Sequence, residues 1–293
     1  KMLLKILKKN LKIKSMKTIL KKLYLFLLFF FILIPGLLVS QNHPKLLLVL
    51  ENGLVKIETY PNKAPNTVKR IIELANEGFY DGLTFHRVIK GFMAQAGDPN
   101  SKINDFNGQL GQKSFGETIP AEFISEYIHK KGALAAARMG DNANPEKKSS
   151  GSQFYFVQGK TYSELQLKQM EQKMNQQQEN ILIGKFLKKT ENVHYMDQIK
   201  YCQQNRLNDS LNMLYQEIKS LVINEEENKF SFSKDAIETY KTTGGTPFLD
   251  NGYTVFGEVI EGIEVIDAIC TVPTLAGDKP VEPITIIAIS IKK

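Results

Sequence analysis

At 293 residues, with 42% apolar and 24% charged side chains, the chain has the composition of a globular protein of one large or two modest domains. Its formal net charge of +7 is unevenly distributed, because residues 1–40 contain nine lysines and no acidic residue. The other 253 residues carry 29 basic and 31 acidic side chains, a net charge of −2. A nearly neutral body argues against a nucleic-acid-binding protein, which needs a basic face for phosphates.

The first 40 residues have the pattern of an export signal. Three lysines within residues 17–22 precede an unbroken apolar run, Leu23–Ile34, and Pro35-Gly36 ends that helix. Ser40 is a small residue at a candidate cleavage point. Twelve apolar residues suit a signal peptide better than a membrane span, which needs about twenty. We therefore expect an exported protein, periplasmic or secreted, with residues 1–40 as its leader.

Two details of the leader leave alternatives open. Leu37–Val39 could extend the apolar run into an uncleaved membrane anchor. Met16-Lys17 would begin a conventional leader, which makes residues 1–15 an upstream translation artefact. Cys202 and Cys270 are the only cysteines, so the chain is not a disulfide-stapled scaffold, and two cysteines this far apart do not establish a pair.

Short strands and turn dipeptides dominate the first half of the chain after the leader. Two β-rich runs joined at Asn52-Gly53 predict a hairpin over residues 45–60. A helix is predicted from Pro65 to Gly78, because apolar residues recur on one face between a proline and a glycine. Further strands are expected at 84–89, 92–96, 133–138, 154–158, 254–259 and 284–291, with a second helix at 263–269. Many short strands and two helices indicate a mainly β protein, a closed β-barrel capped by helices.

The composition changes between residues 161 and 246. Residues 166–180 are rich in glutamine, and strand patterns are absent. Leu207, Leu211, Leu214, Ile218 and Leu221 are spaced 4-3-4-3, which predicts an amphipathic helix whose stripe serves internal packing or, as the alternative, a partner. A further helix is expected after Ser233 as N-cap, ending at the glycines of residues 244–245. We interpret 161–246 as a helical insertion, because the strand pattern resumes after it.

Arg87 is the most informative residue of the strand region. Alternation along the expected strand predicts that Phe85 and Arg87 share one face and that His86 and Val88 share the other. A lone arginine inside a barrel would be very costly, so Arg87 is expected to point outward, to solvent or to a ligand groove. Met93 and Gln95 share a face of the next strand, which favours the groove.

Other chemical motifs are better explained by structural roles. His86 has no metal-ligand or triad spacing, and Ser152 lacks the nucleophile-elbow pattern, so we expect a structural histidine and a turn serine. Glu122 and Glu126 fit a solvated helical turn. In the glycine-rich loops no Lys-Ser/Thr pair follows in P-loop order, so they predict loop flexibility. No motif predicts a metal or a cofactor.

Taken together, the motifs resemble those of the cyclophilin family of peptidyl-prolyl cis-trans isomerases. FHRVIKGFMAQAGDP, GALAAAR, SSGSQFYF and FLDNGYTVFGEVIEGIEVID occur in the family's order, and the resemblance covers residues 46–160 and 247–291. The resemblance implies an eight-stranded antiparallel barrel formed by residues 41–160 and 247–293, with a helix over each end. It also implies an outer groove that binds proline-containing peptides and unfolded proteins, and no cofactor.

The resemblance also implies roles for individual residues. Arg87 matches the catalytic arginine. The walls of the proline pocket match Phe92, Met93, Tyr155 and Leu249. Four residues match the groove that holds the neighbouring peptide backbone: Gln95, Ala137, Arg138 and Gln153. Two further residues, Phe248 and Tyr253, match rim positions.

Four of these positions depart from many eukaryotic members. Phe248 stands in place of Trp, Tyr253 in place of His, Arg138 in place of Asn, and Tyr155 in place of Phe. The departures are similar to those of bacterial members and put binding of the inhibitor cyclosporin in doubt. The expected activity is isomerisation of X–Pro bonds in unfolded or exported proteins. A peptide-binding chaperone module with little turnover, which contacts clients or partners through residues 161–246, is the alternative.

Overall fold

The computed structural model describes residues 43–292, apart from 103–105, 107 and 223–228. The expected leader lies outside the described residues. Within these residues, no helix has both the length and the hydropathy of a membrane span. Cys202 and Cys270 are both buried and free.

The chain starts with the hairpin that the Asn52-Gly53 dipeptide predicts. Strand β1 (Lys45–Leu50) pairs antiparallel with β2 (Gly53–Thr59), with Leu50 opposite Gly53. Alternate residues of both strands, including Leu48 and Val55, are buried in the main core. A two-residue turn between half-buried strands therefore sets the register of the sheet.

The hairpin belongs to an eight-stranded sheet whose hydrogen-bonded neighbours are all antiparallel. The strand order is β3-β4-β6-β5-β7-β2-β1-β8. The other strands are β3 (Arg87–Ile89), β4 (Met93–Ala96), β5 (Ala133–Ala136), β6 (Phe154–Val157), β7 (Val255–Glu261) and β8 (Ile286–Lys292).

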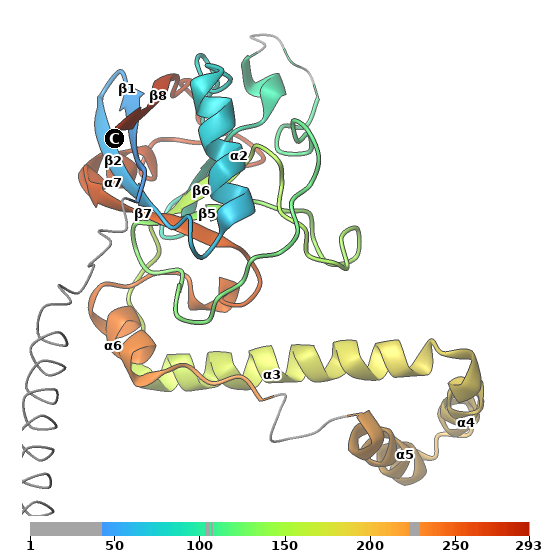
Figure 1. The fold of residues 1–293 in the computed structure, drawn as a ribbon. Helices are drawn as coiled ribbons and strands as arrows, with labels where there is room; N and C mark the ends of the chain where they lie inside the picture. The colour runs from blue at the N-terminus through green and yellow to red at the C-terminus, as the bar shows by residue number, and fades with distance from the viewer. Residues whose placement is uncertain (1–42, 103–105, 107, 223–228, 293) are drawn as a thin grey trace, which may run out of the picture. The chain divides into compact units, whose positions relative to one another are not determined.

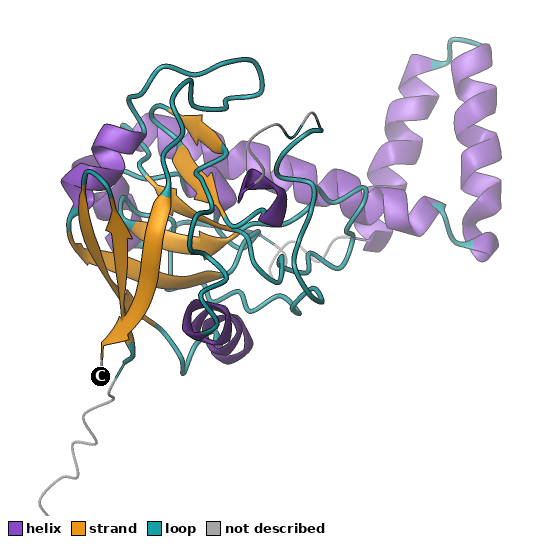
Figure 2. Cartoon of the chain, turned by 90° about the horizontal axis from the view of Figure 1, so that it is seen from above, coloured by secondary structure: helices purple, strands orange, loops and turns teal. Residues whose placement is uncertain are grey.

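The strands curl into an open half-barrel (Figure 2), so the prediction of a closed barrel is wrong. Strands β3 and β8 lie at the two ends of the sheet. The expected strand 84–89 is split, because only its second half forms β3 and its first residue contacts the segment that precedes β8. Thr84 forms an isolated bridge with Thr285, whereas only Arg87–Ile89 pairs with β4. One bridge joins the two edges where a closed barrel would have a continuous ladder.

Two helices pack on the sheet and complete the main core. Helix α2 (Pro65–Asn76) begins with proline at its first turn and buries a stripe that includes Val68, Ile71 and Leu74. Helix α7 (Ile263–Ile269) buries Ile266 and Ile269 in the same core. Both predicted helices are confirmed. The apolar faces of the helices and of the sheet therefore form one continuous core.

Between β6 and β7 the structure has four α-helices (Figure 1): α3 (Glu164–Leu187), α4 (Val193–Gln204), α5 (Asn208–Val222) and α6 (Lys234–Thr242). The described part of the chain also has the 3₁₀ segments η1 (Pro99–Lys102), η2 (Thr190–Asn192) and η3 (Pro247–Leu249). The predicted N-cap of α6 is confirmed, because the Ser233 hydroxyl accepts a hydrogen bond from the Ala236 N–H. The leucine stripe packs internally at Leu214 and Ile218.

The two ends of this helical segment meet at a backbone bridge. The Lys160 N–H donates to the Gly245 carbonyl, and the Gly245 N–H donates to the Lys160 carbonyl at 3.0 Å. A Cβ at Gly245 would lie 2.2 Å from the carbonyl oxygen of His129. The glycine therefore allows a close backbone approach, where the sequence had suggested only loop flexibility.

Candidate functional site

The outer face of the sheet carries a row of three groove candidates. Arg87 is directly opposite Gln95, and Gln95 is directly opposite Tyr155. Side chains that are opposite each other in a ladder point to the same face. The intervening residues Ala94 and Ala96 belong to the core on the inner face. Register alone therefore brings a cation, an amide and an aromatic ring together.

The predicted alternation before β3 is wrong. Phe85 and Val88 both lie in the main core, so Phe85 does not share a face with Arg87. The strand begins only at Arg87, and the backbone at Phe85 instead donates to the Ile284 carbonyl. Thr84 forms a bridge with Thr285, and the backbone N–H groups of Phe85 and His86 donate to Ile284 and Gln95, so residues 84–86 lie outside the regular ladder and do not continue the alternation of β3.

Arg87 is half-buried next to one carboxylate. Its Nε lies 3.3 Å from Oδ2 of Asp278, and the two side chains are 42% and 43% exposed. The terminal nitrogens of the guanidinium have no hydrogen-bond partner among the described residues. Arg87, Gln95 and Asp278 line a hollow of about 580 Å³. A permanently charged donor is therefore available to a ligand in this hollow.

A second amide holds Gln95 in place. Gln95 Nε2 donates to Oε1 of Gln153 at 2.8 Å, and Nε2 of Gln153 donates to the carbonyls of Gly111 and Lys113. Gln153 is almost fully buried. The Oε1 atom of Gln95 has no partner among the described residues, so it can accept an N–H from a ligand.

An apolar cluster lies beside this row. Met93 and Tyr155 are buried, whereas Phe92, Leu249 and Tyr253 are partly exposed against the same cluster. The rings of Phe92 and Phe248 lie 5.6 Å apart, and Phe248 is 45% exposed at the rim. The cluster therefore provides an apolar surface next to the Arg87 guanidinium.

Arg138 braces the opposite side of the groove. Its Nε donates to the Gly252 carbonyl at 2.6 Å, its Nη1 contacts Asp141, and its guanidinium lies 4.4 Å from the Tyr253 ring centroid. Ala137, Arg138 and Gln153 also line a second hollow of about 290 Å³. The structure thus brings together all the predicted site residues in the row, the cluster and the two hollows.

Comparison with known proteins identifies the family. Residues 46–218 and 224–291 match the family model of the cyclophilin type peptidyl-prolyl cis-trans isomerase/CLD. The chain belongs to this family. It is a cyclophilin-type peptidyl-prolyl cis-trans isomerase, as the sequence motifs predicted.

Curated relatives agree with this assignment, and a solved structure has a similar fold. A putative peptidyl-prolyl cis-trans isomerase from Staphylococcus saprophyticus is 29% identical over 253 residues, which cover 86% of this chain and 94% of that protein. A putative bifunctional phosphatase/peptidyl-prolyl cis-trans isomerase from Streptococcus pyogenes is 29% identical over 255 residues, but only 40% of that protein is covered. The fold resembles the crystal structure of a Cryptosporidium parvum cyclophilin type peptidyl-prolyl cis-trans isomerase, with 18% identity and a TM-score of 0.50 over 86% of this chain and 98% of that chain.

His86 and Glu122, for which the sequence predicted only structural or solvated roles, have specific surroundings in this cyclophilin. His86 is buried, burial lowers its pKa to about 4, and neither ring nitrogen has a hydrogen-bond partner among the described residues. Glu122 is not in a solvated helical turn. Its carboxylate accepts the backbone N–H groups of Asn66 and Thr67 at the start of α2. It is a cap for that helix, contributed by a residue far away in sequence.

Sequence reasoning missed three residues near the groove: Asp278, His129 and Asp250. Asp278 is far from Arg87 in sequence and belongs to no motif. His129 lies between the Tyr155 hydroxyl and the Asp250 carboxylate, and burial raises the pKa of Tyr155. Of the three, only Asp250 lies within a motif that resembles the family, FLDNGYTVFGEVIEGIEVID, where it follows Leu249. No group of three or more potential metal ligands occurs in the part of the chain that the structure describes.

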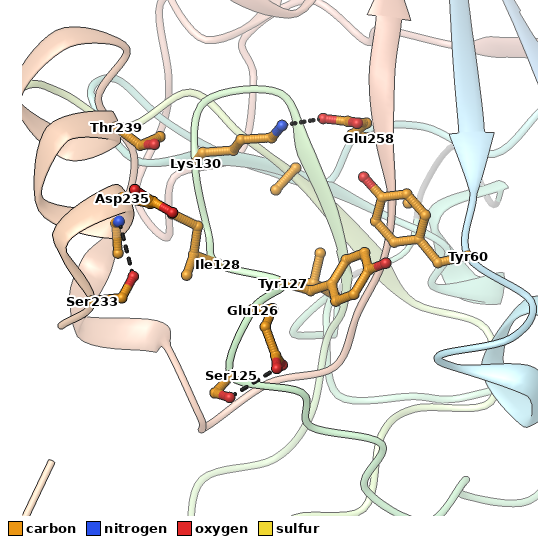
Figure 3. A pocket seen from close by; sticks show the side chains of 14 residues that line it. Tyr60, Ser125, Glu126, Tyr127, Ile128, Lys130, Ser233, Asp235, Thr239 and Glu258 are labelled. Atoms are coloured by element: carbon orange, nitrogen blue, oxygen red, sulfur yellow. Dashed lines mark hydrogen bonds and ion pairs between the residues drawn. The ribbon is translucent and has the colours of Figure 1, made fainter. Parts of the chain in front are cut away.

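A separate pocket of about 420 Å³ lies where α6 meets the outer face of β5 and β7 (Figure 3). Tyr60 and Tyr127 line it opposite Asp235 of α6, and Lys130 forms an ion pair with Glu258. None of the predicted groove residues lines this pocket. It does show that α6 packs close to the sheet of the cyclophilin fold.

Proposed function

We propose that this cyclophilin isomerises X–Pro bonds in unfolded polypeptides by means of the Arg87 guanidinium. The supporting observation is the register that aligns Arg87, Gln95 and Tyr155 on one face, beside an apolar cluster, with no partner among the described residues for the terminal guanidinium nitrogens. Rotation about an amide makes and breaks no σ-bond, so the chemistry requires stabilisation of a twisted state rather than a nucleophile.

Arg87 can stabilise the twisted amide selectively. An X–Pro bond resists rotation by about 18–20 kcal/mol because twisting destroys amide resonance. In the twisted state the prolyl nitrogen regains a localised lone pair, which can accept a hydrogen bond from a guanidinium N–H. In the planar ground state that lone pair is delocalised, so the interaction strengthens mainly in the transition state.

One such donor does not account for the whole acceleration. By analogy with oxyanion-hole donors, Arg87 would contribute about 3–4 kcal/mol. An acceleration of about five decades requires about 7 kcal/mol. The apolar walls of Phe92, Met93 and Leu249 would supply a second contribution, because the planar amide is more dipolar than the twisted one and loses more by desolvation.

The neighbouring groups suit the peptide chain on either side of proline. Gln95 Oε1 would accept a backbone N–H and hold one flank of the substrate while the other rotates. Ala137, Arg138 and Gln153 would contact the backbone beyond it. Phe248 and Tyr253 would close the rim over the proline ring.

An isomerisation assay on a short proline peptide tests the proposal. Wild-type protein should accelerate exchange, and Arg87→Ala should lower kcat/KM by two to three decades, as expected for the loss of about 3–4 kcal/mol. Circular dichroism and melting would verify that the variant is folded. Equal activity of Arg87→Ala and wild type would reject the guanidinium as the catalytic group.

We also propose that the protein acts after export. The lysines before Leu23 and the apolar run to Ile34 support a signal peptide. N-terminal sequencing of protein recovered from the extracytoplasmic fraction tests this. A new N-terminus near Gln41 is expected, whereas full-length protein retained in the cytoplasm would contradict export.

Residues 161–246 are proposed to contact unfolded clients. The support is the exposure of apolar side chains on α4 and α5, among them Tyr201 and Met213, which line a hollow of about 650 Å³. A Tyr201→Ser/Met213→Ser double variant should suppress aggregation of an unfolded client less well while its activity on a short peptide is unchanged. Undiminished suppression would argue against this role.

A further inference from the structure

A buried chain of side-chain hydrogen bonds connects the insertion with the apolar cluster of the groove. The hydroxyl of Tyr240 in α6 donates to Asp250 Oδ2 at 2.6 Å. Oδ1 of the same carboxylate lies 2.9 Å from His129 Nδ1, and His129 Nε2 lies 3.0 Å from the hydroxyl of Tyr155. All four side chains are buried, with Tyr240 fully inaccessible and His129 1% exposed.

The donors and acceptors along this chain fit together in one direction. The Asp250 carboxylate also accepts the backbone N–H of His129 at 2.8 Å, so its oxygens face three donors. His129 Nδ1 must carry a proton to donate to this carboxylate, and in the neutral ring Nε2 is then an acceptor. With the ring neutral, the Tyr155 hydroxyl donates to His129 Nε2 at the buried end of this chain.

The hydroxyl of Tyr155 completes this chain, because it is the partner of His129 Nε2. Phenylalanine at 155 would leave Nε2 of His129 buried without a donor. Removal of the Tyr240 hydroxyl would likewise leave a buried carboxylate oxygen short of one donor. A buried polar network is most stable when every member is satisfied, so a change at one end is felt at the other.

The same chain fixes two walls of the proposed proline pocket. Tyr155 is one wall and Leu249 is another, and Asp250 directly follows Leu249 and the rim residue Phe248. The Thr246 N–H donates to the carbonyl of His129 at 2.8 Å, which ties the segment before these two residues to the same point. Tyr240 lies on the insertion, ten residues before Asp250.

We propose that Tyr240, Asp250 and His129 are positioning residues that hold Tyr155 and the Phe248–Leu249 segment in the geometry that receives proline. The helical insertion is then a working part of the isomerase, because its helix α6 supplies the end of the chain. The inference rests on the proposed function of the groove, and it assigns to Tyr240 an effect on substrate through three intervening side chains.

A double-mutant cycle between the two ends of the chain tests this inference. The variants are Tyr240→Phe, Tyr155→Phe and the double variant. Tyr162→Phe is the matched control, because Tyr162 packs in the same cluster as Tyr240 but its hydroxyl has no hydrogen-bond partner among the described residues. NMR titration with a short proline peptide gives the dissociation constant and the exchange rate of the bound peptide for each.

Tyr240→Phe should weaken peptide binding roughly three- to tenfold, with a smaller change in the exchange rate at saturation, while Tyr162→Phe matches wild type. The double variant should bind much more tightly than the product of the two single effects predicts, because the second change acts on a chain already broken. Multiplicative effects, or equal affinities of Tyr240→Phe and Tyr162→Phe, would overturn the inference.

A reciprocal measurement on Tyr155→Phe tests the inference even if the Tyr240→Phe variant does not fold. Tyr155→Phe keeps every contact of α6 with its neighbours, yet the amide resonances around Tyr240 should shift in it. Unchanged α6 resonances would overturn the inference without recourse to Tyr240 variants. If the wild-type protein bound the peptide but did not accelerate exchange, the proposed function would be rejected. The double-mutant cycle would still test the inference, because it compares dissociation constants and not exchange rates.

Discussion

The ion pair between Arg87 and Asp278 offers a way to separate a catalytic guanidinium from a structural one. Asp278→Ala breaks the same ion pair as Arg87→Ala but keeps the guanidinium at the groove. If the cation acts on substrate, the two variants should differ greatly in activity. If only the ion pair matters, they should have similar effects.

The geometry gives the magnitudes. Two unit charges 3.3 Å apart interact by about 1.3 kcal/mol in bulk water. Because both side chains are more than 40% exposed, screening reduces the contribution to stability to about 0–1 kcal/mol. Asp278→Ala should therefore lower kcat/KM less than about tenfold through looser orientation of Arg87, against two to three decades for Arg87→Ala.

Both variants would be compared with wild type by NMR exchange spectroscopy on one proline peptide, with urea unfolding as the measure of stability. The expected order of activity is wild type, then Asp278→Ala, then Arg87→Ala far below. Loss of activity in Asp278→Ala as large as in Arg87→Ala, at unchanged stability, would refute the assignment of the guanidinium as the catalytic donor.

The other predictions concern stability, pH and inhibitor binding. Glu122→Ala leaves two backbone N–H groups of α2 without their acceptor and should lower the free energy of unfolding by about 1–2 kcal/mol in urea titrations, against less than about 0.5 for Glu126→Ala. Gly245→Ala places a methyl group 2.2 Å from a backbone carbonyl oxygen and should destabilise by about 1–3 kcal/mol on the same measure. His86 has a pKa of about 4 in the folded chain against about 6.5 when unfolded, so its contribution to stability is complete above pH 6.5 and is lost as the pH falls toward 4. Between pH 7 and pH 5, wild type should therefore lose about 2 kcal/mol more unfolding free energy than His86→Gln. Phe248→Trp adds ring area and an indole N–H to an exposed rim position, so cyclosporin should inhibit this variant more strongly than wild type.

Each of these has a clear contrary result. Coincident unfolding curves for Glu122→Ala and Glu126→Ala would show that the start of α2 does not depend on the carboxylate. A stable Gly245→Ala protein would mean that the neck of the insertion can widen. Parallel pH dependences for wild type and His86→Gln would show that His86 is not held neutral, and an unchanged cyclosporin inhibition constant for Phe248→Trp would separate the rim from inhibitor binding.

Local patterns predicted the parts of the fold that local forces determine. The Asn52-Gly53 turn, the proline at the start of α2 and the Ser233 cap of α6 all act within a few residues, and all three predictions are confirmed. The outward position of Arg87 followed from the cost of burying a charge. The motifs placed the other groove residues because their order in the chain is that of the family.

Contacts between distant segments account for what the sequence did not show. The bridge between Thr84 and Thr285 ends the strand that alternation predicted to continue, and it places Phe85 in the core. Glu122 caps a helix more than fifty residues upstream. Asp278 reaches Arg87 across most of the chain. Such partners depend on the folded topology, so no periodicity in the sequence signals them.

The backbone bridge between Lys160 and Gly245 has a consequence for how this chain tolerates change. When the two ends of a long excursion are already side by side, its length adds little to the entropy of closure. We therefore expect that the helical segment between Lys160 and Gly245 can be replaced by another segment of different length. To preserve proline binding, the replacement would have to supply a hydroxyl group that donates to the Asp250 carboxylate, as Tyr240 does.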